Sequence, residues 1–246
     1  MSTEKQLYQY GDFSYSMNES REIIIRHYNG SDSCPLIPTE INGMPVTVLG
    51  KNSFFASPIE SITVPEGIRT IETNAFAVCD DLQKVVLPCS LATIGQGIFQ
   101  GSEMVEDVSI SGESSNFIVA DGILYDRNEN RLVYSPPGLK LEKVIVPYGT
   151  VTIADSAFYC NSHLQYISLP LTLQYIESSA FLFTSSMRII ELPPYLKEIA
   201  DNAFLVGLGP YAEKPFDIFA FPGTKGYEYA EKNRISVHPL YGIVTD

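Results

Sequence analysis

A six-residue segment, Ile-x-x-x-Ala-Phe, recurs along this chain with a spacing of 23 residues. The copies cover residues 71–76, 94–99 (with Ile98 in place of alanine), 153–158, 176–181 and 199–204, and a looser copy covers residues 49–54. A fixed period of about 20 to 50 residues is typical of solenoids, in which each repeat forms one coil and neighbouring coils bury a shared core. The period therefore predicts a repeat solenoid.

A second set of residues with the same spacing indicates how each coil is built. Prolines lie 23 residues apart at Pro65 and Pro88, and again at Pro147, Pro170 and Pro193. Each proline follows alternating apolar residues, which predicts a short strand with one face turned inward. Proline ends that strand because it cannot donate to the next ladder rung. A second short strand is expected after a bend, followed by the Ala-Phe turn.

The complete string, Leu-x-x-Ile-x-Leu-Pro-x-x-Leu-x-x-Ile-x-x-x-Ala-Phe, resembles the BspA-like leucine-rich repeat family. The resemblance implies a mainly β solenoid, a leucine-rich-repeat right-handed superhelix of stacked short strands. It also implies an N-terminal β cap, an inserted β-hairpin and a short C-terminal helical cap. We therefore expect a single domain over residues 1–246, with the cap at 1–45, the repeats at 46–205 and the C-terminal cap at 206–246.

The repeats are interrupted between Ser111 and Pro147, which lie 36 residues apart, 13 more than one period. The extra length falls near residues 116–138, where apolar segments at 118–125 and 131–135 flank a polar run. This pattern predicts a β-hairpin with a polar tip, and the resemblance implies the same. The tip begins like a calcium loop, but Arg131 and Pro137 occupy positions that need Gly and Glu, so a plain turn is favoured.

Both ends of the chain lack the repeat. Residues 7–15 and 22–26 are expected to form strands of the N-terminal cap, and residues 217–221 a last strand. Residues 224–233 predict a short helix, with Thr224 as its N-cap. Tyr227 and Ala230 of this helix should face the core, followed by Ile235.

No pattern of catalytic or metal-binding residues stands out. The histidines (His27, His163 and His238) are isolated, and the cysteines (Cys34, Cys79, Cys89 and Cys160) match neither a metal spacing nor a small disulfide framework. We interpret the cysteines as small apolar filler in solenoid turns. The chain contains no nucleophile elbow, phosphate loop or dinucleotide fingerprint. We therefore expect no enzyme activity, no catalytic residues, no metal and no cofactor.

The charge balance and hydropathy limit the classes of partner. The formal net charge is -13, which opposes nucleic-acid binding and adsorption to anionic lipid, and would favour a basic partner. No apolar stretch approaches the roughly 18 residues of a membrane span. The first thirty residues hold no signal-peptide core. A complete chain would then be cytoplasmic, whereas a trimmed one is compatible with an extracellular or cell-surface location.

Outward strand positions are the candidate ligand-binding residues. In the repeat at 164–169 the outward pair is Tyr166 and Ser168, with Tyr175 in the second segment of the same coil. The equivalent pairs in neighbouring coils are Lys143 with Ile145 and Ile189 with Glu191. Tyrosine offers a large contact area with a polar group, which suits interfaces. The alternative is that outward sheet positions favour β-formers in any case.

These observations predict a non-catalytic protein–protein recognition module whose outward sheet face binds a protein ligand. Relatives implied by the resemblance are mostly bacterial or protist proteins, many at the cell surface, that bind proteins or other cells. The alternative is a carbohydrate-binding module or adhesin, because tyrosine rings can stack on sugars. An enzyme acting on polysaccharides would need clustered carboxylates, whereas the outward positions supply only Asp107 and Glu191, several coils apart.

Overall fold

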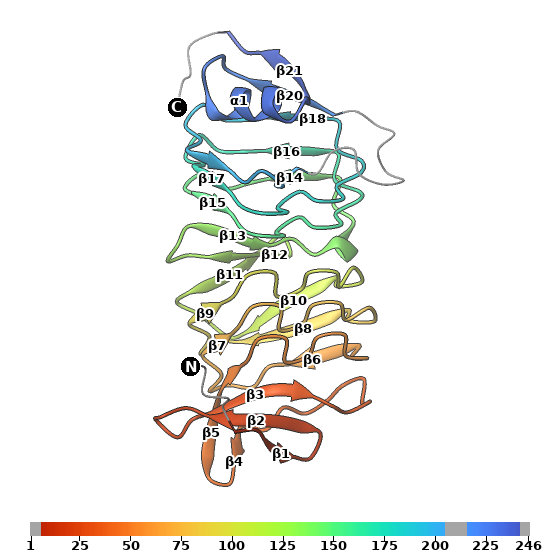
Figure 1. Ribbon diagram of the computed structural model, residues 1–246, viewed down its shortest axis with the longest axis vertical. Coiled ribbons are helices and arrows are strands. Elements are labelled where there is room, and N and C mark those ends of the chain that lie inside the picture. Colours follow the sequence, from red (N-terminus) through yellow and green to blue (C-terminus); the bar gives the residue numbers. More distant parts are fainter. Residues whose placement is uncertain (1–5, 205–215, 242–246) are drawn as a thin grey trace. The chain divides into compact units, whose positions relative to one another are not determined.

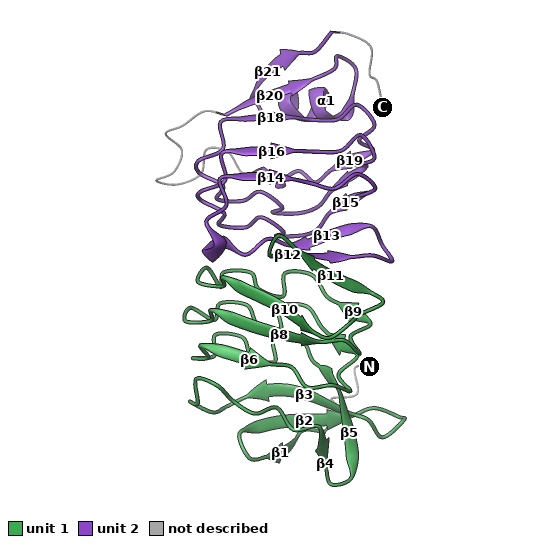
Figure 2. Ribbon diagram, turned by 180° about the vertical axis from the view of Figure 1, so that it is seen from behind, with its two compact units in different colours: residues 1–122 green, residues 123–246 purple. Residues whose placement is uncertain are grey.

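The computed structural model describes residues 6–204 and 216–241. The chain forms two compact units, residues 1–122 and 123–246, each a stack of coils made from short strands (Figure 2). The predicted mainly β solenoid is confirmed, since parallel pairing at repeat-equivalent residues links the coils within each unit. That the two units form a single domain stays a prediction.

Unit 1 begins with an antiparallel cap and continues as parallel coils (Figure 1). Its first sheet runs in the order β1-β2-β3-β5-β7-β9, and β4 pairs with β5. Its strands are β1 (Tyr8–Tyr10), β2 (Phe13–Met17), β3 (Ile23–Tyr28), β4 (Glu40–Ile41), β5 (Met44–Leu49), β7 (Thr70–Ile71) and β9 (Thr93–Ile94). A turn at Gly11 divides the predicted segment 7–15 into the β1–β2 hairpin.

A second sheet of unit 1 supplies the other side of the coils. It has the order β10-β8-β6, with β6 (Ser61–Thr63), β8 (Lys84–Pro88) and β10 (Asp107–Ser111) in parallel register. The unit ends with β11 (Phe117–Ala120). The Ser33 carbonyl accepts hydrogen bonds from the amides of Glu60 and Ser61, so contacts between coils begin before residue 46.

Unit 2 repeats this plan. The antiparallel strands β12 (Ile123–Asp126) and β13 (Arg131–Tyr134) form a hairpin as predicted, but its expected first arm, 118–125, is interrupted by a turn at Asp121 and Gly122. At its tip, the Asp126 carboxylate accepts the amides of Asn128 at 2.8 Å and Glu129 at 3.1 Å, as in an ordinary Asx turn. Parallel strands β15 (Thr152–Ile153), β17 (Tyr175–Ile176) and β19 (Glu198–Ile199) continue from β13, after a 3-10 turn at Pro137–Leu139.

Two further sheets complete unit 2. One pairs β14 (Lys143–Ile145) with β16 (Tyr166–Ser168), and the other has the order β18-β20-β21. The strands of the second are β18 (Ile189–Glu191), β20 (Asp217–Ala220) and β21 (Ser236–Pro239). The last strand predicted at 217–221 is therefore present, whereas β21 was not predicted. Residues 205–215 and 242–246 of the expected C-terminal cap lie outside the described residues.

The predicted C-terminal helix is α1 (Lys225–Lys232), and the Thr224 hydroxyl accepts the Tyr227 amide as its N-cap. Ala230 is buried as expected, whereas Tyr227 is only partly buried against the core. Tyr229, which was not predicted to face the core, is 5% exposed. Its hydroxyl donates to the Asp201 carbonyl at 3.2 Å, so a polar contact ties the helix to the last repeat.

Stacked phenylalanines form the centre of each unit. In unit 2 the rings of Phe158 and Phe181 lie 5.1 Å apart with an interplanar angle of 4°, and those of Phe181 and Phe204 lie 4.7 Å apart at 3°. In unit 1, Phe54 and Phe76 lie 5.3 Å apart, and Phe99 stacks on Phe76. These rings are buried, so the Phe of each repeat belongs to the shared core of the stacked coils.

The turns beside each Phe explain the small polar residues of the repeat. Two residues before Phe76 and Phe181, Asn74 and Ser179 have φ of 58° and 54°. The left-handed region favours Asn and Gly over most residues. The chain can therefore make a tight turn at the same position of the repeat, just before the Ala-Phe pair.

Candidate functional site

Four of the predicted face residues lie together on β14 and β16. The register places Lys143 opposite Tyr166 and Ile145 opposite Ser168, while Val144 and Ile167 point into the core. Ile145 is 66% exposed and Tyr166 is 49% exposed. The Lys143 Nζ lies 5.3 Å from the centre of the Tyr166 ring, within cation–π range. These strands thus present an aromatic, an aliphatic and a cationic group side by side.

Two more predicted residues, Ile189 and Glu191, lie on β18, which belongs to a separate sheet. Both are exposed, while Ile190 between them is buried. Figures 1 and 2 both show β18 beside β16 on the same side of unit 2. The outward face therefore continues from β14 through β16 to β18, although ladder pairing does not join β16 to β18 in the part of the chain that the structure describes.

Tyr175 is placed apart from this group. It lies on β17, in the sheet that runs through β13, β15 and β19, and its register partners are Thr152 and Glu198. Its ring is partly buried and lies 5.9 Å from the Lys197 Nζ. The bend after Pro170 separates the two segments of the coil. Tyr166 and Tyr175 therefore belong to different sheets of the same unit.

Sequence reasoning missed residues that extend the face onto the C-terminal strands. Across β18, β20 and β21, Ile189 pairs with Asp217, which pairs with Ser236. Likewise, Glu191 pairs with Phe219, which pairs with His238. The Phe219 and His238 rings are stacked, with centres 4.7 Å apart and an angle of 20°. Alternation of polar and apolar residues in 236–238 was the available signal. The loss of the 23-residue spacing obscured it.

The Asp217 carboxylate is held in place on this extension. Hydrogen bonds from the Ser236 hydroxyl and from His238 lower the pKa of Asp217. The His238 Nε2 lies 3.3 Å from the Asp217 Oδ1. The ionised form of Asp217 is therefore stabilised by neighbouring hydrogen-bond donors.

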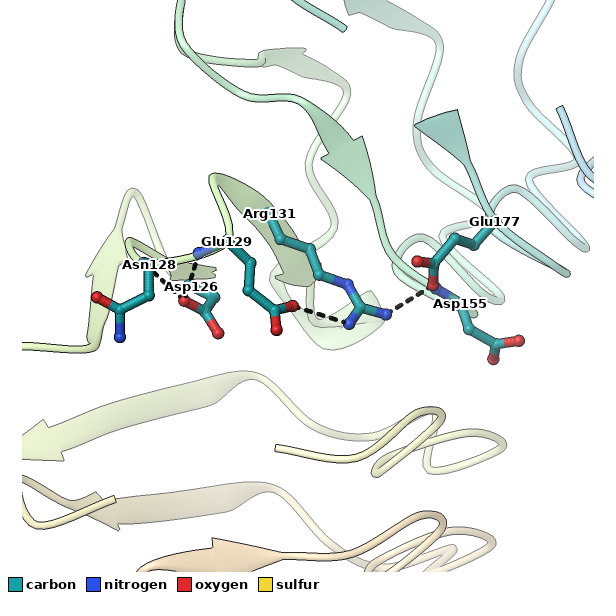
Figure 3. A network of polar contacts seen from close by, with 6 residues as sticks. All are labelled: Asp126, Asn128, Glu129, Arg131, Asp155 and Glu177. Atoms are coloured by element: carbon teal, nitrogen blue, oxygen red, sulfur yellow. Dashed lines mark hydrogen bonds and ion pairs between the residues drawn. The ribbon is translucent and has the colours of Figure 1, made fainter. Parts of the chain in front are cut away.

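A separate polar network surrounds Arg131 at the inserted hairpin (Figure 3). The Arg131 Nη2 lies 2.6 Å from the Glu177 carboxylate, and its Nη1 lies 3.5 Å from that of Glu129. The same Glu177 oxygen accepts the Asp155 amide at 2.9 Å. The arrangement links the hairpin to the coils that carry β15 and β17. It leaves no paired nucleophile and base, so we interpret it as structural.

This network gives a testable stability effect. Replacing Arg131 with Met should destabilise unit 2 by about 1 kcal/mol, because the partly buried ion pair is lost but Glu177 keeps solvent contact and its amide donor. Urea unfolding followed by circular dichroism would measure the change. The matched control is Arg127→Met at the exposed hairpin tip, which should shift stability by less than about 0.5 kcal/mol. Equal stability of the two variants would contradict this role.

One of the four cysteines, Cys79, serves packing in the core, whereas Cys34 is exposed and Cys89 and Cys160 are partly buried. Cys79 is fully buried, and its Sγ donates to the Phe54 carbonyl at 3.0 Å. Burial raises the pKa of the Cys79 thiol to about 11, which makes it unreactive near neutral pH. None of the four cysteines, all of which lie in the described residues, forms a disulfide. Across residues 6–204 and 216–241, no group of His, Cys, Asp or Glu is arranged to hold a metal ion.

Comparisons with known proteins agree with this architecture. The family described as BspA type leucine rich repeat region matches six copies, over residues 32–121 and 137–206. Curated protein sequences give no match.

Solved structures show the same fold at low sequence identity. The pneumococcal vaccine antigen PcpA is 15% identical, with a TM-score of 0.51 over 97% of this chain and 99% of that chain. A leucine rich cell surface protein from Faecalibacterium prausnitzii is 15% identical, with a TM-score of 0.51 over 99% and 97%. A leucine-rich repeat protein from Eubacterium ventriosum is also 15% identical, with a TM-score of 0.52 over 88% and 72%.

The helix content bears on membrane insertion. Within the described ranges, no helix has both the length and the hydropathy required to span a bilayer.

Proposed function

Because the chain belongs to the BspA-type leucine-rich repeat family, we propose that it is a non-catalytic recognition protein that binds a protein ligand. The binding surface is the outward face of β14, β16 and β18 in unit 2. This surface is called the unit 2 face below, and its residues are Lys143, Ile145, Tyr166, Ser168, Ile189 and Glu191.

One observation carries the proposal, namely the grouping of large apolar side chains in exposed positions of regular strands. Ile145, Tyr166 and Ile189 are 66%, 49% and 48% exposed, and their neighbours in the strands are buried core residues. Single exposed apolar residues are ordinary on protein surfaces. A cluster on neighbouring strands with charged residues at its margin is typical of an interface, where a few aromatic and aliphatic groups supply most of the affinity.

The location of the ligand is part of the same proposal. The Faecalibacterium prausnitzii protein is described as a cell surface protein, and by analogy this chain would meet its ligand outside the cell. The alternative ligand is a glycan stacked on the exposed tyrosine.

The test compares wild type with an Ile145→Ser/Tyr166→Ala variant of the full chain. Captured ligands from cell extracts and culture medium would be quantified by mass spectrometry. We expect the variant to lose at least about tenfold in retention of a protein ligand, since truncation of two interface anchors removes more than about 1.4 kcal/mol.

The matched control is Tyr10→Ala/Phe55→Ala, which removes two exposed aromatic residues from unit 1. It should retain the ligand at the wild-type level. If the control loses the ligand and the unit 2 variant keeps it, the assigned face is wrong. If only glycans depend on Tyr166 in a parallel glycan array, the carbohydrate alternative replaces a protein ligand.

A further inference from the structure

The turns that lead into the strands of the outward sheets carry opposite charge in the two units. For each strand we take a four-residue window that ends at the first residue of the strand. The windows are 58–61, 81–84 and 104–107 in unit 1, and 140–143, 163–166 and 186–189 in unit 2. The unit 1 windows hold one cation against four carboxylates, a net charge of -3: Lys84, Glu60, Asp81, Glu106 and Asp107. The unit 2 windows hold three cations against one carboxylate, a net charge of +2: Lys140, Lys143, Arg188 and Glu142.

The three cations in the unit 2 turns differ from most other cations of the described residues because they form no ion pair. The lysine and arginine side chains that do form ion pairs in the described residues are Arg26, Arg69, Lys84, Arg131, Lys225 and Lys232. In the same residues, Lys140, Lys143 and Arg188 form no ion pair. The Arg188 Nη1 donates only to main-chain carbonyls, including that of Ser185 at 3.1 Å. We call Lys140, Lys143 and Arg188 the basic edge.

The basic edge borders the apolar part of the unit 2 face. Lys143 belongs to both, because its ammonium lies over the Tyr166 ring. Arg188 immediately precedes the exposed Ile189. Among the described residues, the carboxylates on the same side are Glu142 beside the edge, Glu191 at the far end of β18, and Asp217, whose Oδ1 lies 3.3 Å from the His238 Nε2. Positive charge and exposed apolar area therefore adjoin each other.

Local charge outweighs the net charge at such a surface. At physiological ionic strength, exposed charges more than about 8 Å apart are largely screened from one another. The chain's net charge of -13 therefore acts on distant encounter, whereas contacts at the face depend on the basic edge. A basic partner, which the net charge alone would favour, would meet like charge here.

We propose that the ligand of the unit 2 face is an acidic polypeptide segment that also carries aromatic or aliphatic side chains. Its carboxylates pair with Lys140, Lys143 and Arg188, and its apolar side chains pack on Ile145, Tyr166 and Ile189. This inference rests on the proposed function and specifies the class of partner. Charge complementarity selects the ligand, because Lys140, Lys143 and Arg188 form no ion pair within the described residues and can pair with carboxylates of a partner.

The test uses a fluorescein-labelled random copolymer of glutamate and tyrosine, titrated with the full chain at about 150 mM salt and followed by anisotropy. We expect saturable binding that the Lys140→Glu/Lys143→Glu variant weakens by at least about tenfold. The control is Arg21→Glu/Lys51→Glu, which makes the same change in net charge at exposed unit 1 cations that form no ion pair in the described residues. It should change affinity by less than about twofold.

Two further probes separate this inference from the proposed function. If a lysine–tyrosine copolymer binds and only the Ile145→Ser/Tyr166→Ala variant abolishes its binding, the face recognises polypeptides but the acidic partner is wrong. If polygalacturonate binds as tightly as the glutamate–tyrosine copolymer and needs the same lysines, the ligand is an anionic glycan and both proposals fail. Absence of binding by the glutamate–tyrosine copolymer, or equal weakening by the control, also overturns the acidic partner.

Discussion

Replacing Phe181 with Ala is expected to destabilise unit 2 by about 3–5 kcal/mol, the usual range for removal of a buried phenylalanine. Phe181 is 2% exposed and stacks on rings in both neighbouring coils, at 5.1 Å from Phe158 and 4.7 Å from Phe204. The substitution removes both contacts and leaves a cavity between rigid coils. In a repeat protein each coil depends on its neighbours, so the loss should spread along the stack. Urea unfolding monitored by circular dichroism measures it.

The control for this prediction is Phe55→Ala, which deletes the same side chain at a position 42% exposed in unit 1. Its cost should stay below about 1 kcal/mol, because exposed substitutions leave no cavity. A Phe181→Ala variant as stable as this control would show that the phenylalanine ladder does not hold unit 2 together.

Replacing Gly95 with Ala is expected to destabilise unit 1 by about 3 kcal/mol, because the added Cβ meets main chain that cannot move aside. The Cβ would lie 2.7 Å from the carbonyl carbon of Glu72 and would also collide with the main-chain nitrogen of Thr73. The Gly95 amide donates to the Ile71 carbonyl at 2.7 Å, which holds the two coils at this separation. Thermal and urea unfolding would both report the loss.

The sign of the Gly95 effect is itself informative. Where no clash occurs, Gly→Ala usually stabilises a protein by about 0.4–1 kcal/mol, because it restricts the unfolded chain. Gln96→Ala at the adjacent exposed position is the control and should be close to neutral. Stabilisation by Gly95→Ala would mean that these coils are not closely packed.

The requirement for glycine at residue 95 could not be predicted from the repeat pattern. Its equivalents in the other copies are Gly50, Glu72, Ala154, Glu177 and Ala200, so four of the five carry a side chain at this position of the repeat. The close approach of two particular coils, rather than the repeat itself, excludes one at residue 95. The recurrence of the same residue types every 23 residues therefore predicts the fold, but it does not predict how closely each pair of coils packs.

The candidate site was predicted in part. Alternation around each proline correctly identified the outward residues of β14, β16 and β18, because inward and outward positions alternate along a strand. It could not show that Tyr175 belongs to another sheet than Tyr166, since the angle between two segments of a coil is not encoded in the spacing. The repeat pattern also did not identify Phe219 and His238. These residues extend the outward face on β20 and β21, where the 23-residue spacing is lost.

The sequence by itself determined the coil, its period, the buried Phe ladder, the inserted hairpin and the helical cap. These follow from local patterns, because every coil must bury the same positions against its neighbours. The tertiary structure alone decided which side chains from different strands come together: Arg131 with Glu177, Phe219 with His238, and Lys143 over Tyr166. Such contacts join different coils, so they depend on the register between strands, which fixes distances that no single repeat contains.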